Sequence, residues 1–158
     1  MNEIIIRIAQ PKDIEEICHI QHSAVHALKG KLYTIEILNA WAERMTPEVV
    51  QKGMETPEMR GFVAELNGRV VGFALLHESS VRAVYIHPDF QKKGIGSKLL
   101  SHLEEEASSK GLHSLQLESS LNARSFYESH GYQVIKETKF SLSEELSMDS
   151  LEMVKDIS

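Results

Sequence analysis

The chain has 158 residues, 42% of them apolar, which is enough for one domain with a substantial core and too short for two ordinary ones. Its 17 lysines and arginines against 23 acidic residues give a net charge of -6, which argues against a general nucleic-acid binder and favours a cationic or amine-bearing partner. The single cysteine, Cys18, falls among apolar residues and is expected in the core, so neither a disulfide framework nor a Cys-rich metal site is predicted.

The first predicted element is a strand over residues 3–9, which are rich in isoleucine and are followed by the breaker Gln10-Pro11. The isoleucine run ends at Arg7 after a few residues, short of a signal-peptide core and far short of a membrane span. We therefore expect a cytoplasmic protein without a membrane partner.

Helices follow this strand. Asp13 is expected to open the first helix by capping its free N–H groups, with Glu16 three residues further on as in a capping box. Apolar residues then keep helical spacing, and Gly30 is expected to end the helix. A second, weaker helix is predicted over residues 34–43 and a further helical turn over residues 48–54.

The pattern changes to strands after Gly61. Residues 62–66 and 69–77 are strand-like and are joined by Asn67-Gly68, the two-residue turn best suited to a tight hairpin. These residues therefore predict an antiparallel pair.

A crossover unit comes next. A strand over residues 81–87, a glycine-containing loop, a helix over residues 97–110 closed by Gly111 and a strand over residues 114–118 place the two strands parallel in one sheet.

The C-terminal part is predicted as a short helix over residues 122–130 and a closing hairpin. Residues 132–142 alternate as a strand, and Leu151, Met153 and Ile157 alternate again after a polar stretch. Together the elements predict a mixed α/β architecture with a single layer of sheet, in one domain spanning residues 1–158.

The loop after residues 81–87 has the features of an anion cradle. Consecutive N–H groups at a helix start have no partner within the helix and, with the helix dipole, suit a phosphate or pyrophosphate. Gly94 and Gly96 let the backbone approach such a group closely. A dinucleotide fingerprint would need a glycine at Leu99, and a triphosphate loop would need Gly-Lys-Ser or Gly-Lys-Thr where Ser97-Lys98 follows Gly96.

This loop reads Gln91-Lys92-Lys93-Gly94-Ile95-Gly96, and it resembles the Gln/Arg-x-x-Gly-x-Gly/Ala acetyl-CoA loop of the GCN5-related N-acetyltransferases, the GNAT family. Residues 85–88 ahead of it resemble that family's fourth strand, residues 122–132 resemble its later helix and strand, and the element order matches over essentially the whole chain. The alternative is that the two glycines merely permit a tight turn, with Lys92 and Lys93 as solvated charge.

The resemblance implies a single mixed, mostly antiparallel sheet of about seven strands flanked by helices on both faces. It implies acetyl-CoA as cosubstrate without a metal, and transfer of the acetyl group to a primary amine of a small molecule, peptide or protein by direct attack in a ternary complex. The residues that it assigns to the cofactor are Val84 and Ile86, by their main chain, together with Gln91, Lys92, Lys93, Gly94, Ile95, Gly96, Ser97 and Asn122.

The reaction needs help for the departing thiolate and a neutral amine. The family's thiolate partner is a helix tyrosine, matched here by Tyr127; its alternative role is core packing beside Phe126. Many relatives carry an asparagine seven residues before that tyrosine, where this chain has Ser120, so helix capping is the alternative for Asn122, which lies five before it.

No general base stands out from the sequence. Glu118 ends the strand opposite the cradle, where some relatives place a catalytic glutamate, and it is the candidate that we retain. Glu65, His77 and Glu78 are the other candidates on the middle strands.

The acceptor side is less defined. Trp41 and Tyr33 lie in the helical region that walls the acceptor pocket in this family, with core packing as their alternative. The competing function is a regulatory module that binds acetyl-CoA or CoA without transferring the acetyl group. A homodimer is left open as the assembly state.

Overall fold

The computed structural model describes residues 3–28 and 32–158 as an open seven-stranded sheet in the order β1-β2-β3-β4-β5-β7-β6. All neighbouring strands are antiparallel except β4 and β5, which are parallel. The strands are β1 (Ile4–Ile8), β2 (Met59–Leu66), β3 (Arg69–His77), β4 (Ser80–Ile86), β5 (Ser114–Ser120), β6 (Gln133–Ser141) and β7 (Ser147–Asp156).

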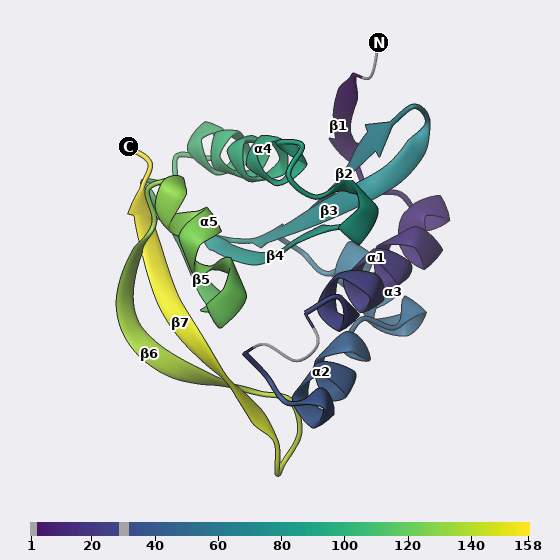
Figure 1. Cartoon of the computed structure of the whole chain (residues 1–158). Helices are drawn as coiled ribbons and strands as arrows, with labels where there is room; N and C mark the ends of the chain where they lie inside the picture. The colour runs from purple at the N-terminus through teal and green to yellow at the C-terminus, as the bar shows by residue number, and fades with distance from the viewer. Residues whose placement is uncertain (1–2, 29–31) are drawn as a thin grey trace.

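Helices cover both faces of this sheet, as expected from the sequence (Figure 1). Helix α4 packs on one face, and α1 and α3 pack on the other. The helices are α1 (Ile14–His26), α2 (Ile35–Ala42), α3 (Pro47–Glu55), α4 (Ile95–Ser109) and α5 (Arg124–Ser129), with 3-10 turns η1 (Pro11–Asp13), η2 (Pro88–Phe90) and η3 (Leu121–Ala123). The predicted mixed, mostly antiparallel sheet is confirmed, whereas the predicted helix end at Gly30 lies outside the described residues.

Alternation along β2 supplies side chains to two of the hydrophobic core clusters, one on each face of the sheet. Phe62 and Ala64 pack into the cluster that contains the apolar stripe of α4, whereas Val63 packs into the cluster that contains Ile17 and Ile20 of α1. Successive side chains of a strand point to opposite faces, so a central strand covered on both faces is buried at consecutive positions. A fully buried Phe, Val or Ile side chain contributes about 1.5–3 kcal/mol to the stability of the fold.

The start of α1 differs from the prediction. Asp13 lies at the N-cap, but its side chain makes no capping hydrogen bond to that helix. Instead its carboxylate accepts from the Arg7 guanidinium at 2.8 and 2.9 Å and from the Gln10 N–H at 2.8 Å. Arg7 also pairs with Glu65 on β2. The ion pair, which no local pattern shows, therefore replaces the predicted capping box with Glu16.

Substituting Asp13 by asparagine is expected to make stability less dependent on acid pH. Burial alone would raise the pKa of Asp13, but the hydrogen bonds from Arg7 and Gln10 hold it below its ordinary value. A lowered pKa stabilises the fold above the unfolded-state pKa of about 3.9, and this stability is lost as the pH falls through the folded-state pKa.

The unfolding free energy of Asp13→Asn, measured in urea, should therefore be lower than that of the wild type by about 3 kcal/mol near neutral pH. The difference should shrink on acidification. Asp89→Asn, at an exposed carboxylate, is the control and should stay within about 0.5 kcal/mol. A wild-type advantage that is equal at all pH values would contradict this assignment.

Strands β4 and β5 separate soon after they begin. They pair only at Ser80 with Gln116 and Val81 with Leu117, whereas β5 continues to pair with β7 as far as Ser120. Arg82 is an extra residue in β4, because Val81 and Ala83 pair with adjacent residues of β3. Such a bulge increases the local twist. The β6–β7 hairpin curves away with β5, so the second half of β4 has lost its neighbour on one side (Figure 1).

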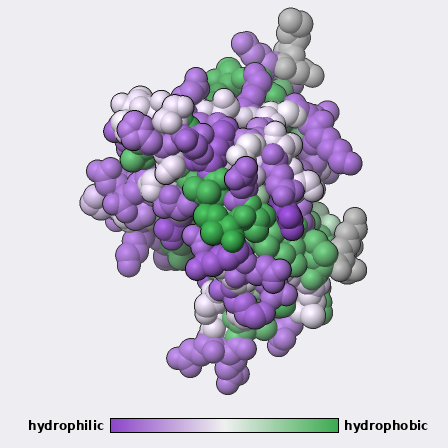
Figure 2. Space-filling view, turned by 90° about the vertical axis from the view of Figure 1, so that its left-hand side faces the viewer, coloured by the Kyte–Doolittle hydropathy of each residue, from purple (hydrophilic) through white to green (hydrophobic). Residues whose placement is uncertain are grey.

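The surface is hydrophilic with a local hydrophobic area. Figure 2 shows this area in the middle of the side that is at the left of Figure 1; it continues toward the lower right of the view and has hydrophilic residues on its left. The large apolar side chains that are exposed come from several elements: Ile5, Ile8, Leu32, Ile35, Val49 and Ile135. Within residues 3–28 and 32–158, no helix is both long and apolar enough to cross a membrane.

Candidate active site

The free edge of β4 is the first component of the candidate site. The His87 N–H donates to the Val71 carbonyl on β3 at 2.9 Å. Because peptide groups alternate in direction along a strand, the N–H and C=O groups of Val84 and Ile86 point away from β3, toward the side that β5 has left. Their side chains pack against the α4 face. These two residues, predicted as main-chain ligands, therefore offer backbone groups at an open edge.

The loop that follows β4 is held by its own side chains. Gln91 Nε2 donates to the Ile86 carbonyl at 2.9 Å, and His87 Nδ1 accepts from the Asp89 N–H at 3.1 Å. Lys92 and Gly94 are both left-handed, with φ of 61° and 81°. Glycine takes this conformation without steric cost, whereas lysine does so rarely. The predicted Gln91 thus ties the loop to the strand end.

Helix α4 begins at Ile95, two residues earlier than predicted, and Gly94 is its N-cap without a side-chain cap. Its first intrahelical bond runs from the Lys98 N–H to the Gly94 carbonyl at 3.1 Å. The N–H groups of Ile95, Gly96 and Ser97 therefore have no acceptor within the helix. Such a helix start can receive an anion.

The two loop lysines supply positive charge to this helix start. Lys92 and Lys93 are exposed, and neither forms an ion pair within the described part of the chain. The four-residue turn from Gln91 to Gly94 thus combines cationic side chains with free N–H groups.

The two glycines of the loop have different structural roles. A Cβ on Gly94 would meet nothing within 4 Å, so its requirement is the left-handed backbone. A Cβ on Gly96 would lie 3.2 Å from the Phe126 ring, so this glycine allows α5 to pack directly on the first turn of α4. The sequence suggested that both glycines serve approach to an anion; for Gly96 the close neighbour is an aromatic ring of the same chain.

Tyr127 lies on α5, next to Phe126, and is 7% exposed. Its hydroxyl has no hydrogen-bond partner among residues 3–28 and 32–158. Burial raises the pKa of Tyr127 well above its ordinary value, and the neighbouring Tyr85 phenol adds to the shift. The side chain is therefore a neutral hydroxyl donor at physiological pH, in a site with little water.

Glu118 is placed on β5 by the sheet. Leu115, Leu117 and Ser119 are buried on the α4 side, so Glu118 projects from the opposite face. Its Oε2 accepts from the Ser150 hydroxyl at 2.8 Å and from the Thr138 hydroxyl at 3.1 Å. The carboxylate is exposed, and its two hydrogen-bond donors come from β7 and from β6, the strand beyond it.

The other predicted bases are located differently. Glu65 is paired with Arg7 on the far strands of the sheet. His77 and Glu78 lie at the turn where β4 begins, whereas the cradle follows its end. Glu118, in contrast, lies on β5, the strand that separates from β4.

A buried polar chain behind β4 was not predicted. Trp41 Nε1 donates to the Tyr85 hydroxyl at 2.9 Å, and Gln21 Nε2 donates to the Trp41 carbonyl at 2.8 Å. Gln21 is 1% exposed, and its Oε1 has no partner among the described residues. Tyr85 lies between Val84 and Ile86 on β4, so these hydrogen bonds fix its hydroxyl group on the face of the strand opposite α4. In the sequence, Gln21 carried no signal of its own, and Trp41 was expected only in the wall of the acceptor pocket or in core packing.

Asn122 and Tyr33 meet near the start of α5. They line an apolar recess of about 260 Å³ with Leu28 and Leu32. The Tyr33 hydroxyl donates to the Asp149 carbonyl at 2.6 Å and accepts from the Leu121 N–H at 2.8 Å. The N-cap of α5 is Ala123, so the alternative of helix capping by the Asn122 side chain is wrong.

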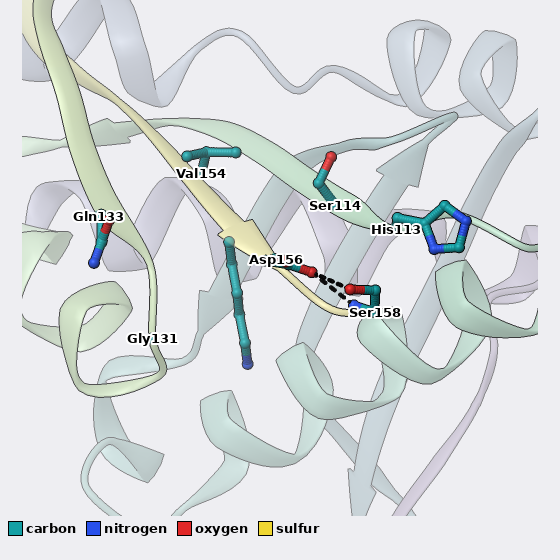
Figure 3. Close-up of a pocket in the computed structure, with 8 residues that line it drawn as sticks. His113, Ser114, Gly131, Gln133, Val154, Asp156 and Ser158 are labelled. Carbon is teal, nitrogen blue, oxygen red and sulfur yellow. Dashed lines mark hydrogen bonds between the residues drawn. The ribbon is translucent and has the colours of Figure 1, made fainter.

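A larger depression lies elsewhere. It encloses about 650 Å³ at the start of β5 and the end of β7, next to residues such as His113, Gly131 and Asp156 (Figure 3). The Asp156 carboxylate is already bonded to the N–H and hydroxyl of Ser158. Because β4 and β5 are parallel, the start of β5 and the loop after β4 lie at opposite ends of the sheet. This depression is therefore separate from the candidate site.

No cluster of three or more metal-ligating side chains occurs in the part of the chain that the structure describes. The free Cys18 is partly buried against the hydrophobic cluster that contains Ile17 and Ile20, as expected, and burial raises the pKa of its thiol.

Comparison with known proteins identifies relatives of this arrangement. A family model described as an acetyltransferase (GNAT) domain matches residues 18–143. The uncharacterized N-acetyltransferase YafP of Escherichia coli (strain K12) is 28% identical over 139 residues, covering 88% of this chain and 87% of its own.

Two solved structures extend the comparison. A GCN5-related N-acetyltransferase from Rhodopseudomonas palustris matches with a TM-score of 0.89 and 25% identity, covering 99% of this chain and 97% of its own. The putative acetyltransferase yncA of Salmonella typhimurium, solved with its cofactor acetyl-CoA, matches with a TM-score of 0.73 and 27% identity, covering 98% and 94%. With the family model spanning most of the chain, this protein belongs to the GNAT acetyltransferase family and is an acetyl-CoA-dependent N-acetyltransferase.

Proposed function

We propose that residues 1–158 form one catalytic domain that binds acetyl-CoA along the free edge of β4 and transfers its acetyl group to a primary amine. The acceptor is a small molecule, a peptide or a protein. The observation that carries this proposal is the end of β4–β5 pairing at Val81 and Leu117, which opens a strand edge between the cradle and Tyr127.

The pyrophosphate is assigned to the first turn of α4. Free N–H groups of Ile95, Gly96 and Ser97 are available there, with Lys92 and Lys93 beside them. The helix dipole contributes about 0.3–1 kcal/mol to anion binding at an exposed site, so hydrogen bonds and charge must supply the rest. Asn122, at the start of α5, is assigned to the same cofactor.

The main chain of β4 is assigned to the thioester end. Acetyl-CoA supplies the activated acetyl group, and the Val84 and Ile86 peptides supply directed hydrogen-bonding groups at the opened edge. The Ile86 carbonyl is already used by Gln91, so its N–H is the free group of that residue. An N–H at this edge can hold the acetyl oxygen as negative charge develops on it.

Two side chains are assigned to hydrogen bonding and proton transfer in the reaction. Tyr127 donates a hydrogen bond to the departing thiolate, and Glu118 accepts the proton of the amine, directly or through water. A lysine-like amine of pKa about 10.4 needs about 4–5 kcal/mol to lose its proton at pH 7. Deprotonation of the amine is therefore the costly part of the reaction, and a base is expected to assist it.

We assign direct attack of the amine in a ternary complex. Cys18, the single cysteine, lies on α1 and packs into the core on the sheet face away from α4. A thiol there cannot reach the cradle to carry the acetyl group, which supports transfer without a covalent enzyme intermediate.

Glu118→Gln is expected to lower kcat/KM for a primary amine by about 100-fold near pH 7. The loss should diminish toward pH 9 to 10, where more of the amine is already neutral. The measurement is a pH profile of thiol release. Glu152→Gln is the matched control, because Glu152 faces Glu118 across the β5–β7 pair but bonds with Lys136. A loss that is equal for both variants would remove Glu118 from the proposed base role.

The acceptor class is tested by acetyl-CoA consumption over polyamines, amino acids, aminoglycosides and peptides with free N-termini. We expect saturable thiol release with at least one class, with a preference for cationic acceptors because the chain carries a net charge of -6. Absence of thiol release with the whole panel, despite measurable acetyl-CoA binding, would contradict transfer to such amines.

A further inference from the structure

His130 joins the two helices that meet at the cradle. Its Nε2 lies 2.8 Å from the Ser97 hydroxyl in the first turn of α4. Its Nδ1 lies 2.8 Å from the Phe126 carbonyl and 3.1 Å from the Ser129 hydroxyl, both on α5. The imidazole is half-buried and packs on the Phe126 ring with centroids 4.7 Å apart. The ring therefore bridges the helix start that is assigned to pyrophosphate and the helix that carries Tyr127.

The contacts determine which nitrogen carries the proton. A backbone carbonyl only accepts, so Nδ1 is the protonated nitrogen and faces Phe126. In the neutral ring Nε2 can only accept, and the Ser97 hydroxyl must then donate to it. In this state the hydrogen of Ser97 points at His130 and only oxygen lone pairs remain for other partners.

A cationic ring reverses this arrangement. With both nitrogens protonated, Nε2 donates to Ser97 Oγ and leaves the hydroxyl hydrogen free. An anion bound at the N–H groups of residues 95–97 then gains a donor where it would otherwise meet lone pairs. A neighbouring anion also favours the charged ring itself.

We propose that His130 is a positioning residue of the cradle, which turns the Ser97 hydroxyl toward the bound pyrophosphate when its ring is cationic. The inference rests on the proposed placement of the pyrophosphate at the start of α4. It adds a residue that the loop motif does not include.

The charged groups around this ring are few. Lys98 follows Ser97 directly on α4, and Lys92 and Lys93 lie in the loop before this helix. On α5, Arg124 and Glu128 form an exposed pair with each other at 3.1 Å. From β7, Lys155 approaches Gly131, next to His130, and pairs with Glu104 at 3.0 Å. None of these side chains makes a hydrogen bond or ion pair to the imidazole among the described residues.

The test uses dephospho-CoA, which keeps the pyrophosphate but lacks the 3′-phosphate, whose own ionisation near pKa 6 would confuse the profile. Its dissociation constant is measured calorimetrically between about pH 5.5 and pH 8. We expect the wild type to bind about 3- to 10-fold more weakly at the upper end, the equivalent of one hydrogen bond.

Variants separate His130 from other histidines near the loop, such as His87. In His130→Gln the side-chain amide can replace Nε2 and donate to Ser97 at every pH, so binding should stay near the low-pH wild-type value throughout. In His130→Asn the shorter amide can reach the Phe126 carbonyl but not Ser97. Binding should then be weak and independent of pH, as it should be in Ser97→Ala. Thermal unfolding of all four proteins reports any loss of folding.

The outcomes are distinct. A wild type that binds without pH dependence, or a His130→Gln variant that keeps the wild-type slope, overturns the role of His130. Equal losses in the Gln and Asn variants would also overturn it, because they would point to general packing. If the wild type does not bind dephospho-CoA at any pH, the proposed cofactor site itself fails, whatever the variants do.

Discussion

Tyr127→Phe is expected to lower kcat for acetyl transfer by about 100- to 1,000-fold while leaving the affinity for acetyl-CoA nearly unchanged. The ring and its packing on Phe126 remain, and only the hydroxyl is lost. Loss of one donor to a developing negative charge in a site with little water costs about 2.7–4 kcal/mol.

The expected role of this hydroxyl is donation rather than complete proton transfer. A thiol has a pKa of about 8.5 and an ordinary tyrosine about 10, so full transfer is already uphill by about 2 kcal/mol. Burial raises the pKa of Tyr127 further, which makes full transfer more unfavourable. Ionisation would remove the donor only on the alkaline side, and the raised pKa moves that loss upward, so activity should show no loss from ionisation of Tyr127 up to about pH 10.

Tyr132→Phe is the matched control for Tyr127→Phe. Tyr132 is also a buried tyrosine, with its ring centroid 5.7 Å from that of Tyr127, but its hydroxyl donates to Glu104 at 2.8 Å. This control should lose stability rather than kcat. A Tyr127→Phe enzyme that keeps wild-type kcat would contradict the proposed role, as would an equal drop in kcat for both variants.

Gly96→Val is expected to lower kcat/KM by at least about 100-fold and to weaken acetyl-CoA binding. Even a Cβ would stand 3.2 Å from the Phe126 ring, and a branched side chain must displace the ring and α5 with it. A shift of about 1 Å in a positioned catalytic group can cost 100-fold in rate. The substitution thus disturbs the anion cradle and Tyr127 together.

Two further variants separate this contact from general effects. Gly53→Ala changes a helical glycine on α3 that has nothing within 4 Å of an added Cβ, and it should leave activity unchanged. Adding Phe126→Leu to Gly96→Val opens space and should restore part of the binding. Full activity of Gly96→Val alone would show that the contact between α4 and α5 does not position the site.

Much of the fold could be predicted because it follows from local patterns. Residues 69–77 were predicted as a strand with the bounds that β3 has, and Asn67-Gly68 forms the turn before it. Gly111 adopts the left-handed conformation that ends α4. These features depend on alternation and on the conformational range of glycine, both of which are visible in short segments.

The opening between β4 and β5 could not be predicted in the same way. The crossover unit correctly indicated parallel strands, but their pairing stops after Val81, where Arg82 is inserted against β3. How far two strands stay together depends on twist and on the helices that pack on them. No pattern within residues 81–87 indicates how long β4 stays paired with β5.

Side-chain contacts between different elements account for most of the remaining differences. Asp13 could be recognised as a helix-start residue, but its carboxylate accepts hydrogen bonds from Arg7 and does not cap the helix. The bond from Trp41 to Tyr85 and the bond between His130 and Ser97 join residues more than 30 positions apart. The motif predicted where the cradle lies in the sequence and that Tyr127 lies on a helix. The side chains that orient the cradle and this helix could be identified only from the three-dimensional structure.

The most direct test of the account is a crystal structure of this protein with acetyl-CoA. We expect pyrophosphate oxygens to accept hydrogen bonds from the N–H groups of residues 95–97, and the pantetheine arm to follow the free edge of β4 at Val84 and Ile86. The sulfur should lie within hydrogen-bonding reach of the Tyr127 hydroxyl. A cofactor that occupies another surface, or one that leaves the β4 edge free and its sulfur remote from Tyr127, would contradict the account.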